Sequence, residues 1–114
     1  MELLSGLWAF SAMPHFYEYL GISVFVYSNE HTPIHVHGYY QGGESKAEIA
    51  VAEDDTIQSI TFEDIKPKRP LPPKQLRDFK KLVTHEAENI VKKWREYFEQ
   101  NLHVEPEIIT RKMR

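Results

Sequence analysis

The stretch LPPKQLRDFKKLVTHEAENIVKKWREY, residues 71–97, decides the fold. Its apolar side chains recur at spacings of three and four, the pattern of an amphipathic helix. These side chains are Leu76, Phe79, Val83, Ala87, Ile90, Trp94 and Tyr97. The two prolines near the start of the stretch suit the first turn of a helix. We therefore predict one long helix of about seven turns, in which Trp94 and Phe79 are core anchors.

The residues before this helix alternate between apolar and polar side chains, as β-strands do. The expected strands are residues 21–27, 34–40, 45–51 and 56–62, and residues 104–110 form an edge strand or a tail. Gln41-Gly42-Gly43-Glu44 suits a tight hairpin between the second and third strands. Because a sheet with one apolar face needs a cover, the predicted fold class is α+β. It is a small antiparallel sheet of three to four strands packed on one long amphipathic helix.

Length and composition favour one folded domain inside the cell. The chain has 114 residues, of which 41% are hydrophobic and 27% are charged. It has no cysteine, so disulfides and thiolate sites are excluded and a cytoplasmic location is expected. Residues 1–12 are apolar but lack a basic start and are too short to cross a bilayer. We predict a single domain over residues 13–114, an N-terminal extension over residues 1–12 and no membrane association.

Charge is distributed unevenly along the chain. The net charge of -3 argues against a strong general affinity for nucleic acid. Residues 66–81, however, contain seven bases and one acid, Asp78. The bases are Lys66, Lys68, Arg69, Lys74, Arg77, Lys80 and Lys81. This segment is either a basic patch or a solvated linker and helix face. A basic patch here is the only feature of the sequence that supports a nucleic-acid partner.

Potential chemistry is concentrated in the stretch HTPIHVH, which begins at His31. His35 and His37 lie two residues apart in an extended segment, so their side chains leave the same face of the strand. Two imidazoles on one face can converge on one metal ion, and His31 could add a third nitrogen. Glu30 or Glu48 could complete the shell or orient an imidazole. A His-x-His pattern alone is a weak signal.

Two of the four interpretations of this stretch involve no chemistry. The histidines can be structural, with their nitrogens hydrogen-bonded to backbone groups around the turn at Pro33. Alternatively, together with Tyr27, Tyr39 and Tyr40 they form a contact surface for a partner protein.

The other two interpretations are a metal site and acid-base catalysis. In the interpretation as acid-base catalysis, paired histidines with pKa values near neutrality cleave RNA beside the basic segment. The candidate catalytic residues are His31, His35 and His37, and the candidate phosphate-binding residues are Lys68, Arg69 and Lys74. No Ser-His-Asp order or phosphate-cradling glycine loop accompanies them. The sequence alone assigns neither a metal nor a cofactor.

Several motifs together resemble a known bacterial family. They are Met13-Pro14-His15-Phe16-Tyr17, Gly21-Ile22 at the start of a strand, the HTPIHVH stretch, the glycine hairpin and a helix that runs from Pro73 to Trp94. This order is similar to the family called domain of unknown function 4160, whose signature is His-x-Pro-Pro-His-aromatic-His. The resemblance covers about residues 13–98. Ile34 and Val36 depart from the signature, but neither change removes a histidine.

The resemblance implies a small bacterial protein, often encoded beside a partner of the family called domain of unknown function 2442. That arrangement is similar to toxin-antitoxin pairs. Our leading hypothesis from the sequence is therefore a protein-interaction module, one half of a toxin-antitoxin-like pair, rather than an enzyme. The partner would be a protein of that second family, and a homo-oligomer is the other candidate assembly. The alternatives are a histidine-dependent ribonuclease or nucleotide-processing enzyme and a histidine-based metal-binding domain.

Overall fold

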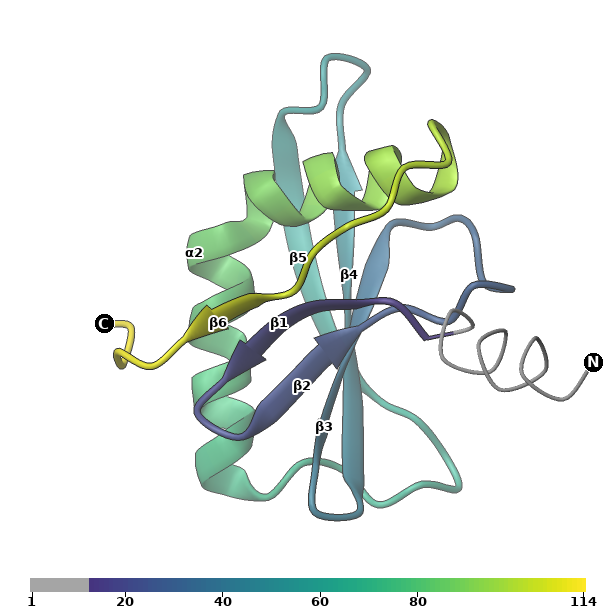
Figure 1. The fold of residues 1–114 in the computed structure, drawn as a ribbon. Helices are drawn as coiled ribbons and strands as arrows, with labels where there is room; N and C mark the ends of the chain where they lie inside the picture. Colours follow the sequence, from purple (N-terminus) through teal and green to yellow (C-terminus); the bar gives the residue numbers. More distant parts are fainter. Residues whose placement is uncertain (1–12) are drawn as a thin grey trace, which may run out of the picture.

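The computed structural model describes residues 13–114, which form one helix and a six-stranded sheet. In chain order the elements are β1 (His15–Tyr19), β2 (Ile22–Phe25), β3 (His35–Tyr40), β4 (Gly43–Val51), β5 (Ile57–Asp64), α2 (Pro73–Phe98) and β6 (Glu107–Ile109). Figure 1 shows α2 beside the sheet, and it contacts β1, β3, β4 and β5. The predicted α+β class is confirmed. The predicted N-terminal extension, residues 1–12, lies outside the described residues.

The sheet is larger than the sequence predicted, and it is mixed rather than antiparallel. Its strand order is β5-β4-β3-β2-β1-β6. The run from β2 to β5 is the predicted antiparallel meander with its fourth strand. The prediction of three to four antiparallel strands was wrong in its count, because β1 pairs antiparallel with β2 and β6 pairs parallel with β1.

Of the two additional strands, β1 was not predicted, and β6 lies within residues 104–110, which were predicted as an edge strand or a tail. In β1 the register shifts between His15 and Tyr17, and the consecutive residues Phe16 and Tyr17 are both fully buried. That irregularity breaks the alternation on which strand prediction depends. The strand β6 has only three residues, and it reaches β1 after the whole length of α2. A parallel pairing across so long a connection leaves no mark in the local pattern.

The helix α2 begins at Pro73 and ends at Phe98, as the apolar spacing predicts. Its apolar side packs on one face of the sheet, and Trp94 and Phe79 are both buried in the core as expected. At Gly38 of β3 a Cβ atom would lie 2.7 Å from the Phe79 ring, so only glycine allows this close approach. No helix among residues 13–114 is long and apolar enough to cross a membrane.

The loop between β5 and α2 returns along the start of β4. The Glu44 N–H donates to the Arg69 carbonyl at 2.8 Å, and the Leu71 N–H donates to the Ser45 hydroxyl at 3.1 Å. These bonds fix the loop beside the β3–β4 hairpin. They also bring Lys68, which belongs to the basic segment, next to the sheet face that carries the histidines.

Candidate functional site

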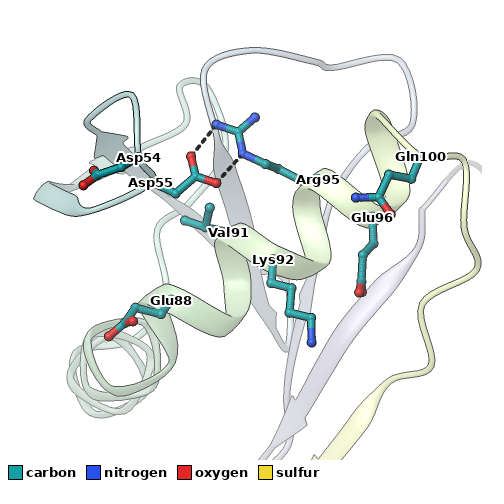
Figure 2. A pocket seen from close by; sticks show the side chains of 8 residues that line it. All are labelled: Asp54, Asp55, Glu88, Val91, Lys92, Arg95, Glu96 and Gln100. Carbon is teal, nitrogen blue, oxygen red and sulfur yellow. Dashed lines mark hydrogen bonds and ion pairs between the residues drawn. The ribbon is translucent and has the colours of Figure 1, made fainter.

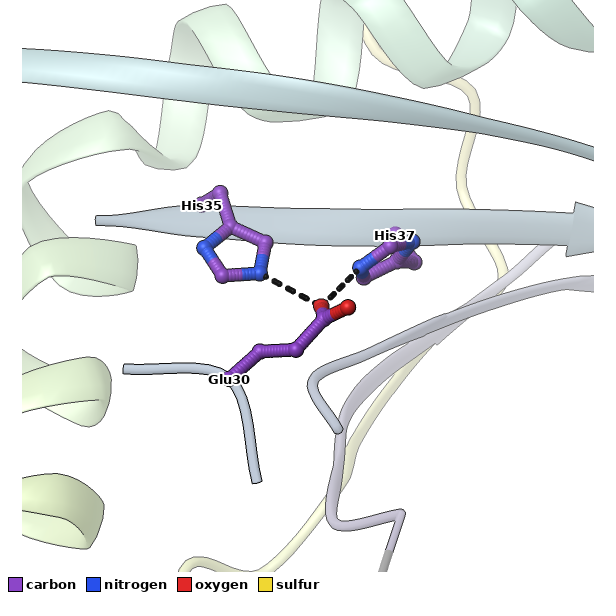
Figure 3. Close-up of side chains that lie close together, drawn as sticks. All are labelled: Glu30, His35 and His37. Carbon is purple, nitrogen blue, oxygen red and sulfur yellow. Dashed lines mark hydrogen bonds and ion pairs between the residues drawn. The ribbon is translucent and has the colours of Figure 1, made fainter. Parts of the chain in front are cut away.

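The strand β3 carries two histidines on the sheet face that points away from α2. Val36 is fully buried in the core that α2 shares, whereas His35 and His37 on either side of it point to the opposite face. The centroids of the two imidazole rings are 5.2 Å apart, and Figure 3 shows both rings on the same side of the strand. The predicted same-face pair is confirmed.

One carboxylate oxygen joins the two rings. Glu30 lies in the turn between β2 and β3, and its Oε1 is 3.0 Å from His35 Nε2 and 2.9 Å from His37 Nε2 (Figure 3). We call these three residues the histidine cluster. Their candidate ligand atoms all lie within 4.8 Å of one another. The histidine side chains are 7% and 4% exposed and the Glu30 side chain is 45% exposed, so the cluster has a buried imidazole side and an accessible carboxylate side.

The Nδ1 atom of His35 already has a hydrogen-bond partner. His35 Nδ1 lies 2.7 Å from the Pro33 carbonyl oxygen, which can only accept, so Nδ1 carries the proton of this hydrogen bond. In a neutral imidazole Nε2 then holds the lone pair, and this lone pair points at Glu30 Oε1. Two acceptors face each other in this way only when a proton or a cation lies between them.

His37 lies between two carboxylates. Its Nδ1 is 3.1 Å from Glu44 Oε2, but this contact is bent, and Nδ1 has no hydrogen-bond partner within residues 13–114. Glu44 is itself buried and accepts hydrogen bonds from the Tyr27 hydroxyl and from Lys68 Nζ, both at 3.0 Å. The bond to Glu44 and one to the Tyr27 hydroxyl raise the pKa of Lys68, which therefore stays charged. A neutral His37 can donate to only one of the two carboxylates, through Nε2 to Glu30 or through Nδ1 to Glu44.

The electrostatics favour a neutral imidazole beside an ionised carboxylate. Burial lowers the pKa of His37 below its usual 6.5, and the hydrogen bond to Glu30 only partly opposes that effect. Burial alone would raise the pKa of Glu30, but its interactions with the rings of His35 and His37 outweigh that effect, so the pKa lies below 4.5. Neutral imidazole and ionised carboxylate are the forms that bind metal ions.

The third histidine of the predicted set lies apart from the pair. His31 is exposed, and its ring packs on the ring of Phe98 at the end of α2, with the two ring centroids 4.9 Å apart. The turn at Pro33 interrupts the extended backbone between His31 and His35, so strand alternation does not carry His31 to their face. The structure therefore brings together two of the three candidate catalytic histidines.

The candidate phosphate-binding residues are also separated. Lys68 reaches the histidine cluster through Glu44, as described above. Arg69 is exposed and contributes its backbone carbonyl to the loop, and Lys74 forms an ion pair with the buried carboxylate of Asp78 at 3.1 Å. Only Lys68 of the three lies beside the histidines.

Of the two acids predicted to lie at the histidines, Glu30 and Glu48, the structure places only Glu30 there. Glu30 contacts both histidines, but Glu48, although opposite His35 in the register, lies 3.6 Å from Lys46. The sequence reasoning missed Glu44. Counting outward from the Gln41-Gly42 turn pairs Tyr39 with Glu44, which places Glu44 diagonally opposite His37. The hairpin signal could therefore have identified this carboxylate.

A second charged region lies at the other end of the meander. An open groove of about 410 Å³ lies between the turn that precedes β5 and the second half of α2, and Figure 2 shows the side chains that line it. We call it the α2 groove, and its lining residues are Asp54, Asp55, Glu88, Val91, Lys92, Arg95, Glu96 and Gln100. Arg95 donates two hydrogen bonds of 2.8 Å to the two oxygens of Asp55 and a third to Glu99. The groove thus holds paired charges.

Comparison with known proteins gives one match. A family model described as Domain of unknown function (DUF4160) matches residues 21–95, a span that runs from β2 into the last turns of α2 and includes the histidine cluster. No curated protein and no solved structure matches the chain.

Proposed function

Because the chain belongs to the family described as Domain of unknown function (DUF4160), we propose its function from the site itself: binding of a divalent transition-metal ion by Glu30, His35 and His37. Two imidazoles and one carboxylate are a known protein ligand set for a metal ion that keeps an open coordination position. The observation that carries the proposal is the direction of the nitrogens. Both Nε2 atoms face one Glu30 oxygen, while Pro33 O and Glu44 lie on the Nδ1 side of the rings.

The spacing of the ligand atoms suits an ion after a small adjustment. Nitrogen and oxygen ligands lie about 2.0–2.2 Å from zinc, which separates them by roughly 3.3 Å in a tetrahedral site. The Glu30 oxygen is now 3.0 and 2.9 Å from the two Nε2 atoms. All three ligand atoms lie within 4.8 Å of one another, so binding of an ion requires Glu30, which is on an exposed turn, and the imidazole rings to adjust around it. The strand would keep the two imidazoles on one face.

The chemistry of the donors selects a class of ion. Imidazole nitrogen suits zinc, iron, nickel and copper, whereas magnesium and calcium prefer oxygen ligands alone. Pro33 O and Glu44 fill the role of outer partners, which in metal sites fix the tautomer of each ligating histidine. We therefore expect Zn²⁺ or Fe²⁺ rather than Mg²⁺.

A purely structural role accounts less well for the same contacts. A neutral His35 cannot donate through both nitrogens, yet both face acceptors. A neutral His37 lies between Glu30 and Glu44 and can donate to only one of them. As a hydrogen-bonded core the cluster must either hold a second proton on the imidazole of His35, a charge on a side chain only 7% exposed, or leave buried acceptors facing each other, and both are costly. A bound cation removes both conflicts.

The test is metal content and affinity of the protein purified without a histidine tag. We expect about one equivalent of Zn²⁺ per chain after reconstitution, and less than about a tenth in the double variant His35→Ala, His37→Ala. The double variant His31→Ala, His103→Ala removes two exposed histidines and should bind like the unchanged protein. Far-UV circular dichroism checks that each variant is folded. Equal zinc binding by the two double variants, or none by the unchanged protein, would overturn the proposal.

Our second proposal is the partner-binding role, and it draws on a different feature. Among residues 13–114 no strand pairs with the outer edge of β5, which ends the sheet order, and such an edge can pair with an added strand. A protein of the domain of unknown function 2442 family is the partner implied by the resemblance. Co-expression of the two proteins should give a complex that Ser59→Pro, placed within β5, weakens while Ser28→Pro in the turn after β2 does not. Separate elution of the unchanged proteins would exclude it.

A further inference from the structure

We propose that the metal ion at the histidine cluster takes an oxyanion, a carboxylate or phosphate group, as its external ligand, and that Lys68 supplies the second contact to that anion. The inference rests on the proposed metal site. Lys68 comes from the loop before α2, far from β3 in the sequence. Its ammonium nevertheless contacts Glu44, the carboxylate that faces His37.

The position of Lys68 is set by two contacts at once. Its Nζ is 3.0 Å from Glu44 Oε1 and 3.2 Å from the Tyr27 hydroxyl, and it lies 5.4 Å from the centroid of the Tyr27 ring. That ring in turn packs edge-on against the ring of His37, with centroids 4.6 Å apart. Glu44 and Tyr27 therefore hold the ammonium near the ring of His37, on its Nδ1 side, while the ion would bind at Nε2.

Exposure separates the groups of the site into two classes. The side chains of His37 and Glu44 are 4% and 7% exposed, whereas those of Lys68 and Glu30 are each 45% exposed. The solvent-accessible charged groups around the two buried side chains are therefore the Glu30 carboxylate and the Lys68 ammonium. An anion is attracted by Lys68 and by the ion, and it can replace or join Glu30 in the coordination sphere.

The charge balance also favours an anion. Two neutral imidazoles, a divalent cation, the carboxylates of Glu30 and Glu44 and the ammonium of Lys68 leave the loaded site with one positive charge. Lys66 and Arg69 on the same loop are exposed and form no ion pair within residues 13–114, so they extend this positive field. A positive site that is partly shielded from water attracts an oxyanion more strongly than the same charges would in bulk water.

The remaining bases of the segment do not share this position. Lys74 is paired with Asp78 on the first turns of α2, and the ammonium of Lys80 lies 5.6 Å from the centroid of the Phe62 ring on β5. Lys68 is therefore the base whose removal should matter. Lys74 provides a matched control from the same basic segment.

The experiment uses the full chain loaded with Co²⁺, whose visible absorption reports ligand exchange. Inorganic phosphate and acetate are titrated separately at constant ionic strength into the unchanged protein, Lys68→Gln and Lys74→Gln. The glutamine at position 68 keeps a hydrogen-bond donor for Glu44 but removes the charge. We expect a saturable spectral change with at least one of the two anions, weakened about fivefold or more in Lys68→Gln and unchanged in Lys74→Gln. Which anion binds distinguishes a phosphate ligand from a carboxylate ligand.

The outcomes separate this inference from the proposal on which it rests. If Co²⁺ binds but neither anion changes its spectrum, or if Lys68→Gln and Lys74→Gln bind the anion equally, the inference is wrong while the metal site stands. Anion binding of equal strength to the metal-free protein would also overturn it. If the unchanged protein binds no Co²⁺, Zn²⁺ or Fe²⁺, the metal site itself fails and this inference fails with it.

Discussion

The histidine cluster and the α2 groove both join charged side chains from different elements, but they match those charges in opposite ways. In the α2 groove two nitrogens of Arg95 meet the two oxygens of Asp55, one donor for each acceptor. In the histidine cluster two Nε2 atoms meet a single oxygen of Glu30, and the buried His37 faces a second carboxylate as well. The α2 groove encloses about 410 Å³, but it is the histidine cluster that contains a buried nitrogen without a hydrogen-bond partner among residues 13–114, Nδ1 of His37.

This difference indicates where a ligand is needed. A bidentate Arg-carboxylate pair satisfies both partners, so adding a ligand to the α2 groove would first have to break that pair. The histidine cluster gains from a cation, because the cation separates acceptors that otherwise repel each other. Changing one group at a time in each region tests this difference.

The largest difference is expected from a carboxylate that does not contact the metal. Glu44→Gln keeps the size of the side chain but removes the charge that faces His37 Nδ1. We expect Zn²⁺ affinity to fall roughly 10- to 100-fold, because outer partners of ligating histidines contribute about that much. Asp55→Asn in the α2 groove should leave the affinity unchanged. Isothermal titration calorimetry measures both, and equal affinities for the two variants would show that Glu44 has no influence on the site.

The helix and the meander were predictable because their patterns are local. Apolar spacing between Leu76 and Tyr97 identified α2, and alternation on either side of the Gln41-Gly42 turn identified β3 and β4. The strand β1 was missed because its irregular register buries Phe16 and Tyr17 together. The strand β6 was left open between an edge strand and a tail, because its pairing with β1 depends on chain geometry beyond the local pattern.

The same division applies to the site. Strand alternation is local, so it correctly placed His35 and His37 on one face. Glu30 was named as one candidate acid because it lies near the histidines in the sequence. The contribution of Lys68 depends on how the loop before α2 folds back along β4, which no spacing in the sequence indicates. His31 separated from the pair because the turn that contains Pro33 interrupts the alternation.

A smaller effect is expected from pH on the stability of the metal-free protein. His37 has a pKa below 6.5 in the folded state because burial disfavours its charged form, so below that pH the unfolded chain binds the proton more readily. Stability should therefore fall as the pH is lowered from about 7 to about 5. The pKa of Glu30 is also lowered, from 4.5, so further stability is lost in stronger acid.

Urea denaturation in the presence of a chelator measures this slope. His37→Gln should flatten it between about pH 7 and about pH 5, whereas His103→Gln, at an exposed position, should leave it as it is. A slope that survives in His37→Gln would assign the pH dependence to another group and would weaken the view of His37 as a buried neutral imidazole.

The smallest effect is expected from the Arg95–Asp55 pair of the α2 groove, in which each donor has its acceptor and both side chains are partly solvated. The side chains of Arg95 and Asp55 are 30% and 40% exposed, so water screens their ion pair even though its geometry is bidentate. Arg95→Met keeps the length of the side chain and should lower the free energy of unfolding by about 1 kcal/mol or less. Its Zn²⁺ affinity should equal that of the unchanged protein. A loss of zinc binding in Arg95→Met would mean that the two regions are coupled, through the packing of His31 on Phe98 at the end of the same helix.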